Sequence, residues 1–207
     1  MFRIVHLLSA VALALVLVAC EDDPPTTSHG DVPLEFPNGV GSSWTYDYAD
    51  SIAVAADSVV VSIVGLKSLP RYGLAKIWQR EFVNAGFVDS QYVVESGDTI
   101  KIYGTAPFPN LITVLLPLEV GNSWTSSPGM IDTTTITDAG QVRIFEPITR
   151  TRYRLRRQWS DLESSEDSEI WLVPDVGIFF MHLNATAPMS GQAVNETWKL
   201  VDYHIQE

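Results

Sequence analysis

A ten-residue stretch occurs twice in this chain of 207 residues. FPNGVGSSWT at residues 36–45 and LPLEVGNSWT at residues 116–125 are identical at six of ten positions, and they begin 80 residues apart. In both copies Pro removes a ladder donor, Gly permits a tight turn, and Trp can bury a large area. Each copy therefore predicts the entrance to a strand, with Trp44 and Trp124 buried at equivalent sites.

A second pair of segments repeats at nearly the same distance. DSQYVVESGDTIKIY (89–103) aligns with DSEIWLVPDVGIFFM (167–181) at an offset of 78 residues, and both have the pattern of a strand, a turn with Gly and another strand. Gly97 and Gly177 are expected to supply the positive φ of these hairpin turns. We interpret the two offsets as the result of a duplication, with similar strand-entry chemistry in unrelated hairpins as the alternative.

Short runs rich in β-branched and aromatic residues make up most of the chain, with Gly, Pro, Asp and Asn between them. No run has convincing helical character, so we expect an all-β antiparallel fold. The ten runs are residues 57–65, 74–83, 91–95, 99–104, 133–137, 141–145, 151–159, 169–173, 177–183 and 196–205. Two duplicated halves of about five strands, pseudo-repeats 36–115 and 116–207, are expected to form one curved sheet, either a half-barrel or a barrel. Residues 36–104 should then superpose on residues 116–183 in strand order and direction.

The N-terminus predicts export and a lipid anchor. Residues 1–19 contain Arg3 and then an apolar run that is shorter than a membrane span of about 20 residues, which is typical of a secretory signal peptide. The sequence LVAC at residues 17–20 resembles the lipobox of bacterial lipoproteins. The resemblance implies that Cys20 is diacylated on sulfur and becomes the mature N-terminus. An ordinary signal peptide or a core helix ending in cysteine is the alternative.

Attachment to a membrane follows from this motif. Each acyl methylene contributes about 0.8 kcal/mol, so two or three chains hold a protein at a membrane without a spanning helix. Residues 20–33 are acidic and rich in Pro, Thr and Ser, which predicts a flexible tether before a single β domain at residues 34–207. In the lipoproteins that the motif resembles, Asp directly after the cysteine retains the protein at the inner membrane. Glu21 at this position favours the outer membrane of a bacterial envelope, with surface export as a further alternative.

Charge and cysteine content exclude some classes of protein. Without residues 1–19 the chain has 12 cationic and 25 acidic residues, a formal net charge of −13. This balance opposes binding to nucleic acid, so we expect no nucleic-acid partner. Cys20 is the only cysteine, and therefore no disulfide can form within the chain.

Two motifs resemble those of a known group of proteins. PLEVGNSW (117–124) and EIWLVPDVG (169–177) look like stretches of uncharacterised bacterial envelope lipoproteins. The sheets of that group are comparable with the half-barrel of the outer-membrane lipoprotein carrier and receptor families. Because neither motif is a catalytic signature, the resemblance implies a fold and no activity.

The search for chemistry is mostly negative. The chain has no motif typical of a serine hydrolase, nucleotide-binding loop, zinc protease, redox dithiol or calcium loop, and it predicts no catalytic residue, metal or cofactor. His29, His182 and His204 are each expected to be core or surface residues rather than zinc ligands. The acidic run DLESSEDSE at residues 161–169 is expected to be a solvated loop between strands, with calcium binding as the alternative.

Four arginines alternate in TRTRYRLRR, residues 149–157. If this segment is a strand, Arg150, Arg152, Arg154 and Arg156 lie on one face. Like charges about 7 Å apart repel by roughly 0.6 kcal/mol per pair in water, so some group should compensate them. Cross-strand carboxylates are one explanation. The other is an anionic ligand, a phospholipid or glycolipid headgroup, which makes these four arginines candidate ligand-binding residues.

Two classes of function fit these observations. The first, which we favour, is a non-catalytic envelope lipoprotein whose curved sheet binds an apolar or amphiphilic ligand or an envelope protein; six Trp and eight Phe can line a concave face or fill a core. The second is an envelope hydrolase with a site built from scattered carboxylates and His182 or His204. A pocket lined by Trp and Phe favours the first class, and two carboxylates with His in one cleft favour the second.

Overall fold

The structure is a computed structural model that describes residues 36–52, 55–105, 110–125, 131–161, 163–187 and 192–206. All of these residues belong to one compact unit, Pro33–Glu207. The signal peptide, Cys20, Glu21, the tether and His29 lie outside the described residues.

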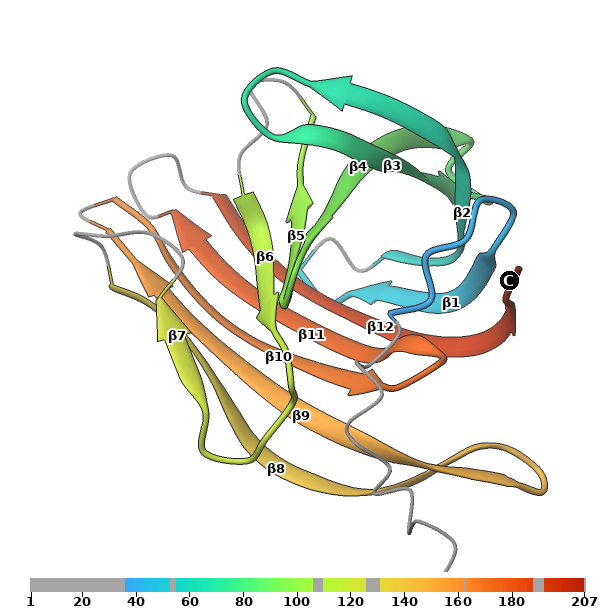
Figure 1. The fold of residues 1–207 in the computed structure, drawn as a ribbon. Helices are drawn as coiled ribbons and strands as arrows, with labels where there is room; N and C mark the ends of the chain where they lie inside the picture. Colours follow the sequence, from blue (N-terminus) through green and yellow to red (C-terminus); the bar gives the residue numbers. More distant parts are fainter. Residues whose placement is uncertain are drawn as a thin grey trace, which may run out of the picture. The chain divides into compact units, whose positions relative to one another are not determined.

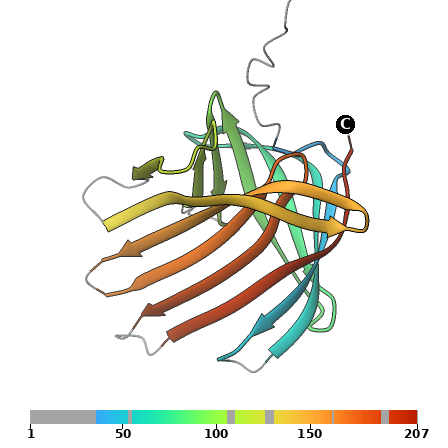
Figure 2. The ribbon, with the colours of Figure 1, turned by 90° about the horizontal axis from the view of Figure 1, so that it is seen from below.

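The described residues form one antiparallel sheet of twelve strands and no helix, which confirms the all-β prediction. The strands are β1 (Ser43–Asp50), β2 (Ala55–Leu69), β3 (Gly73–Phe82), β4 (Phe87–Ser96), β5 (Thr99–Tyr103), β6 (Asn110–Leu115), β7 (Ser123–Thr125), β8 (Ile131–Phe145), β9 (Ile148–Ser160), β10 (Ser165–Val173), β11 (Gly177–Ala187) and β12 (Gln192–His204). Their spatial order is β6-β5-β4-β3-β2-β1-β12-β11-β10-β9-β8-β7, and the sheet curls into a nearly closed barrel (Figures 1 and 2).

The described residues form twelve strands where ten runs were predicted, and the differences concern four strands. Two predicted runs, 133–137 and 141–145, are the single strand β8, because the ladder with β9 continues through Gly140 after a bulge between Ile136 and Asp138. The other three strands, β1, β6 and β7, were not among the ten runs. β1 and β7 nevertheless begin at the two entrance motifs, with Trp as their second residue, as those motifs predicted.

The sheet consists of two six-stranded meanders, β1–β6 and β7–β12, joined by the β1–β12 ladder. At the first entrance the Gly41 N–H donates to the Ile63 carbonyl (2.9 Å). At the second entrance the Gly121 N–H donates to the Ile136 carbonyl, also at 2.9 Å. Both glycines have positive φ, 100° and 94°, and a β-bulge follows both isoleucines.

Each meander also has the predicted hairpin with a left-handed turn residue. Gly97 (φ 56°) lies between β4 and β5, and Gly177 (φ 99°) follows the turn between β10 and β11, where Asp175 also has positive φ. The halves therefore agree in strand order, direction and entrance geometry, with six strands each instead of about five. We propose duplication as the origin of this agreement.

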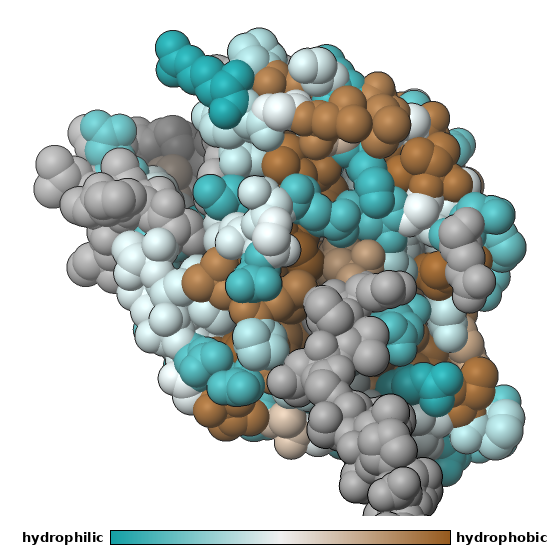
Figure 3. Space-filling view, in the orientation of Figure 1, coloured by the Kyte–Doolittle hydropathy of each residue, from teal (hydrophilic) through white to brown (hydrophobic). Residues whose placement is uncertain are grey.

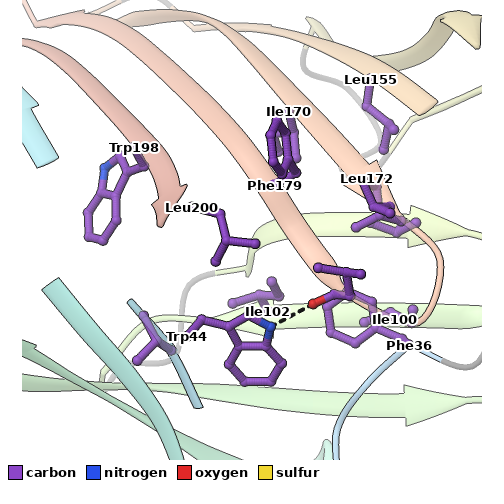
Figure 4. Close-up of a cluster of buried hydrophobic side chains, with 14 of the residues drawn as sticks. Phe36, Trp44, Ile100, Ile102, Leu155, Ile170, Leu172, Phe179, Trp198 and Leu200 are labelled. Carbon is purple, nitrogen blue, oxygen red and sulfur yellow. Dashed lines mark hydrogen bonds between the residues drawn. The ribbon is translucent and has the colours of Figure 1, made fainter. Parts of the chain in front are cut away.

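The interior of the barrel is filled by side chains. One continuous cluster of buried residues receives side chains from strands of both meanders, and Figure 4 shows part of it. Four of the six tryptophans belong to this core: Trp44, Trp78, Trp124 and Trp198. The aromatic residues that could have lined a hollow sheet are therefore used mainly to fill it.

The sheet edges β6 and β7 share no ladder among the described residues, and side chains join them instead. The Trp124 indole N–H donates to the Thr113 carbonyl of β6 (2.9 Å). Two positions earlier on the same strand, the Leu111 carbonyl accepts a hydrogen bond from the Arg157 guanidinium of β9. These two bonds satisfy carbonyls that a closed ladder would otherwise pair.

Arg157 also holds two carboxylates inside the barrel. Its Nε lies 3.1 Å from Asp132 Oδ1 on β8, and its Nη1 lies 3.4 Å from Glu166 on β10. The Asp132 side chain is 2% exposed and that of Arg157 is 11% exposed, so this is a buried ion pair. The cluster connects three elements of the second meander to the edge of the first.

Candidate functional site

A cleft of about 940 Å³ opens at one end of the barrel. Figure 3 shows a hollow with apolar walls near the centre of the face seen in Figure 1. The cleft is formed by the first entrance motif, the β4–β5 and β10–β11 turns and the end of the chain. Its lining residues are Phe36, Pro37, Asn38, Gly39, Lys76, Glu95, Gly97, Ile100, Leu116, Asp175, Tyr203, Ile205 and Gln206.

Stacked aromatic rings support the cleft from below. Phe36 stacks on Trp78 with ring centroids 5.6 Å apart, and Trp78 stacks on Trp44 at 5.3 Å. The Trp44 indole N–H donates to the Val176 carbonyl of the β10–β11 turn (2.6 Å; Figure 4). The floor of the cleft is therefore held in place by the barrel core and by a turn of the opposite meander.

Asn38 is the polar group that distinguishes this cleft. Its Oδ1 accepts a hydrogen bond from the Trp78 indole N–H (3.0 Å), and this bond fixes the orientation of the amide. The residue is 4% exposed, yet its Nδ2 is buried and has no hydrogen-bond partner among the described residues. A buried donor without an acceptor costs free energy, so Asn38 Nδ2 is suited to a carbonyl, hydroxyl or carboxylate oxygen of a ligand.

The second entrance motif lacks both features of the first. The positions equivalent to Asn38 and Gly39 are Leu118, which is buried in the core, and Glu119. A Cβ on Gly39 would lie 2.0 Å from the Gln206 carbonyl oxygen, so only glycine fits beneath the chain end. The two copies therefore share strand entry, and both contribute to the cleft, the first through residues 36–39 and the second through Leu116.

Charged side chains form part of the cleft wall. Lys76 Nζ lies 3.7 Å from Glu95 Oε2, and both side chains are partly exposed. Opposite them, Tyr203 and Ile205 contribute apolar surface from the end of the chain. An apolar wall with one buried amide donor and a lysine suits an amphiphilic ligand better than a wholly polar one.

The four candidate arginines lie on the outer face of β9, because Leu155 and Arg157 of the same strand point into the core. Three of them pair with carboxylates of neighbouring strands: Arg152 with Asp138 (2.7 Å), Arg154 with Glu169, and Arg156 with Asp167 (2.7 Å). Arg150 donates to the Thr149 carbonyl (3.3 Å).

The positive charges of Arg152, Arg154 and Arg156 on the outer face of β9 are thus compensated by carboxylates of the protein itself. The Arg152 guanidinium also lies 4.6 Å from the centre of the Trp171 ring. This pairing favours the cross-strand explanation of the arginine pattern over a lipid headgroup, whose binding to Arg150, Arg152, Arg154 and Arg156 stays a prediction.

Replacing Arg154 and Arg156 with Gln together should lower the free energy of unfolding slightly at neutral pH, since each pair is partly exposed and screened by solvent. The hydrogen bonds from Arg156 hold the pKa of Asp167 below its usual value. A depressed pKa contributes stability above the unfolded pKa of about 3.9 and loses it as pH falls. Urea unfolding should therefore show that the double variant is less stable than the natural chain at neutral pH and equally stable in acid. Arg150→Gln should have no effect on stability at either pH.

His182 is the residue on which a hydrolase site would depend. It lies on the outer face of β11 in a pocket of about 300 Å³ with Asp167 and Glu169, and its Nε2 is 3.3 Å from Asn195 Oδ1. Both carboxylates of this pocket are bound by arginines, which holds them ionised and engaged. The pocket thus combines two carboxylates with His, and each carboxylate is paired with an arginine. His204 is exposed at the end of β12.

The acidic run 161–169 is only partly a loop, contrary to the prediction. Its second half, Ser165–Glu169, is the start of β10, whose acids pair with arginines of β9 as described above. In the turn that precedes it, Asp161 Oδ1 accepts hydrogen bonds from the Glu163 and Ser164 N–H groups, both at 2.7 Å. The described residues contain no cluster of three His, Cys, Asp or Glu that could hold a metal ion.

Two residues of these sites were not predicted from the sequence. Asn38 could have been noticed because it is polar where the second motif has Leu118. Arg157 ends the same arginine-rich segment, and its position out of step with the four alternating arginines was the signal for an inward side chain. No helix among the described residues is long and apolar enough to cross a membrane.

No family model matches the chain, and no curated protein matches it in sequence. Two solved structures resemble it in backbone arrangement. One is a protein from Bacteroides fragilis described as exported and of YmcC-like fold, with 11% identity, a TM-score of 0.49, and coverage of 82% of this chain and 98% of the other. The second is a protein from Parabacteroides distasonis described as a lipoprotein, with 9% identity, a TM-score of 0.45, and coverage of 82% and 97%.

Proposed function

We propose that this chain is a non-catalytic, lipid-anchored binding protein of a bacterial cell envelope, and that its ligand is an amphiphile held in the cleft at the end of the barrel. The lipid anchor rests on the lipobox-like residues 17–20. The ligand site rests on the cleft and on one observation above all, the buried and unpartnered Nδ2 of Asn38.

The packing of the barrel supports the cleft over the lumen as the binding place. The core side chains fill the interior, so a ligand finds space at the end of the barrel and not at its centre. A volume of about 940 Å³ is within the range of sites for small molecules. Phe36, Leu116 and Ile205 would contact the apolar part of the ligand, while Asn38 Nδ2 would donate to its polar end.

A non-catalytic role is the second part of the proposal. The cleft contains two carboxylates, Glu95 and Asp175, and no histidine. Glu95 is engaged by Lys76. The groups that converge on the cleft are thus suited to recognition more than to proton transfer.

Photocrosslinking of the purified full chain with a photoreactive fatty acid tests the proposal. We expect labelled peptides to come from residues 36–39 and from the chain end near Ile205, and excess oleate to prevent the labelling. Ile205→Trp should reduce it by narrowing the apolar part of the cleft. Asn38→Asp keeps the acceptor for Trp78 and replaces the free donor by an oxygen, so it should weaken oleate binding by about tenfold.

His182→Ala is the matched control, because it alters the outer-face pocket and leaves the cleft intact. Labelling on the outer face of β9–β11 that His182→Ala removes would contradict the proposed site. Labelling that neither Ile205→Trp nor Asn38→Asp reduces would contradict it as well. Circular dichroism melts of the variants distinguish a lost ligand from a lost fold.

A further inference from the structure

A third pocket, distinct from the cleft and from the pocket beside His182, lies on the outer face of the first meander. The tip of the β2–β3 hairpin and the outer faces of β4 and β5 form it, with a volume of about 270 Å³. Its lining residues are Arg71, Tyr72, Val94, Ser96, Thr99, Lys101 and Tyr103. Two cations, two phenols and two hydroxyls thus face one small space.

The pocket is built on a core of its own. Leu69, Ala75, Tyr92 and Tyr103 form a buried cluster outside the barrel, with exposed fractions from 1% to 8%. Tyr72 packs on Tyr103 with ring centroids 4.5 Å apart and remains 39% exposed. The cluster therefore holds one aromatic ring rigidly at the surface, where a ligand can pack against it.

The cations of this pocket lack the compensation seen elsewhere. Arg152, Arg154 and Arg156 each pair with a carboxylate, whereas no described carboxylate forms an ion pair with Arg71 or Lys101. The chain as a whole is strongly acidic, but charges beyond about 8 Å are screened at physiological salt. Glu95 and Asp98 are neighbours of Ser96 and Thr99 in the chain, but Arg71 and Lys101 are the charged residues among those that line the pocket itself.

Arg71 is also held in an uncommon backbone conformation. Its φ is 73°, in the left-handed region that favours glycine, although the residue is arginine. Glycine follows two positions later at Gly73, with φ 85°. The turn thus holds an arginine in a backbone conformation in which glycine would be less strained. This is consistent with a functional role for the Arg71 guanidinium.

We propose that this pocket binds a small anionic sugar, such as a hexose phosphate or a hexuronate. Arg71 and Lys101 would bind the anionic group, and the exposed ring of Tyr72 would pack against the sugar face. Ser96 and Thr99 would hydrogen-bond to sugar hydroxyls. The volume of about 270 Å³ suits a ligand of the size of one sugar ring.

Titration of the full chain with glucose 6-phosphate, followed by NMR chemical shifts, tests this inference. Glucose 6-phosphate should shift resonances of residues 71–73 and 99–103 and should bind at least tenfold more tightly than glucose or inorganic phosphate. Arg71→Gly relieves the left-handed strain and removes the guanidinium. It should reduce affinity at least tenfold while the unfolding temperature stays within about 2 °C.

Lys101→Gln should reduce the affinity for glucose 6-phosphate as Arg71→Gly does, and Tyr72→Ala should lower it to that of inorganic phosphate. Arg150→Gln is the matched control, because Arg150 is also exposed and free of an ion pair but lies on β9. Equal binding of glucose 6-phosphate by the Arg71→Gly variant and the natural chain would overturn the inference. So would shifts confined to the cleft residues 36–39.

Discussion

Arg157→Leu is expected to lower the free energy of unfolding by about 3–5 kcal/mol. The substitution leaves the Asp132 carboxylate, which is 2% exposed, without its cationic partner. It also removes the donor to the Leu111 carbonyl at the edge of β6. Breaking a buried ion pair on one side is costly because the remaining charge is buried and uncompensated. Chemical denaturation followed by tryptophan fluorescence measures the change.

Arg156→Gln is the control for this experiment, since Arg156 is the neighbouring residue on the opposite face of the same strand. Its pair with Asp167 is about half exposed and screened by solvent, so its loss should cost far less than the loss of Arg157. The Arg157→Leu variant that also carries Asp132→Leu should recover part of the loss, because the more deeply buried of the two carboxylates is then no longer left charged without a partner. Equal effects of Arg157→Leu and Arg156→Gln would contradict the role of Arg157 in joining the barrel edges.

Cys20→Ser is expected to move the protein entirely from the membrane fraction to the soluble fraction. The hydroxyl cannot accept the acyl chains that the lipobox-like sequence implies, and each lost methylene removes about 0.8 kcal/mol of membrane affinity. Fractionation and immunoblotting of cells that express the full chain measure the distribution. Glu21→Gln, which keeps the cysteine, should remain with the membrane. Retention of the Cys20→Ser chain after a carbonate wash would show that another segment anchors the protein.

The fold was predictable because strand signals are local. β-branched and aromatic runs, the Gly turns at Gly97 and Gly177, and the entrance tryptophans Trp44 and Trp124 each depend on a few neighbouring residues. The alternation of arginines along β9 likewise predicted that four of them share one face. Cross-strand carboxylates were one of the two explanations for how their positive charge is compensated. These features need no knowledge of which strands lie side by side.

The cleft and the barrel edge depend on contacts between residues far apart in the sequence. Asn38 meets Trp78 from another strand, and Gly39 lies beneath the chain end at Gln206, so neither role is visible in a local pattern. The continuation of β8 through Gly140 was missed for a related reason. Glycine signals a turn locally, while the long ladder with β9 keeps the strand extended.

Native mass spectrometry of the full chain, extracted gently from its membrane, tests the central proposal most directly. The account predicts the mass of the acylated chain plus one amphiphilic molecule, released on collisional activation and less abundant on the Ile205→Trp chain. Phe36 and Leu116 would provide the apolar contacts that retain it during extraction. A natural chain that always carries only the mass of its acyl groups, even in the mildest detergent, would contradict a ligand-binding function for the cleft.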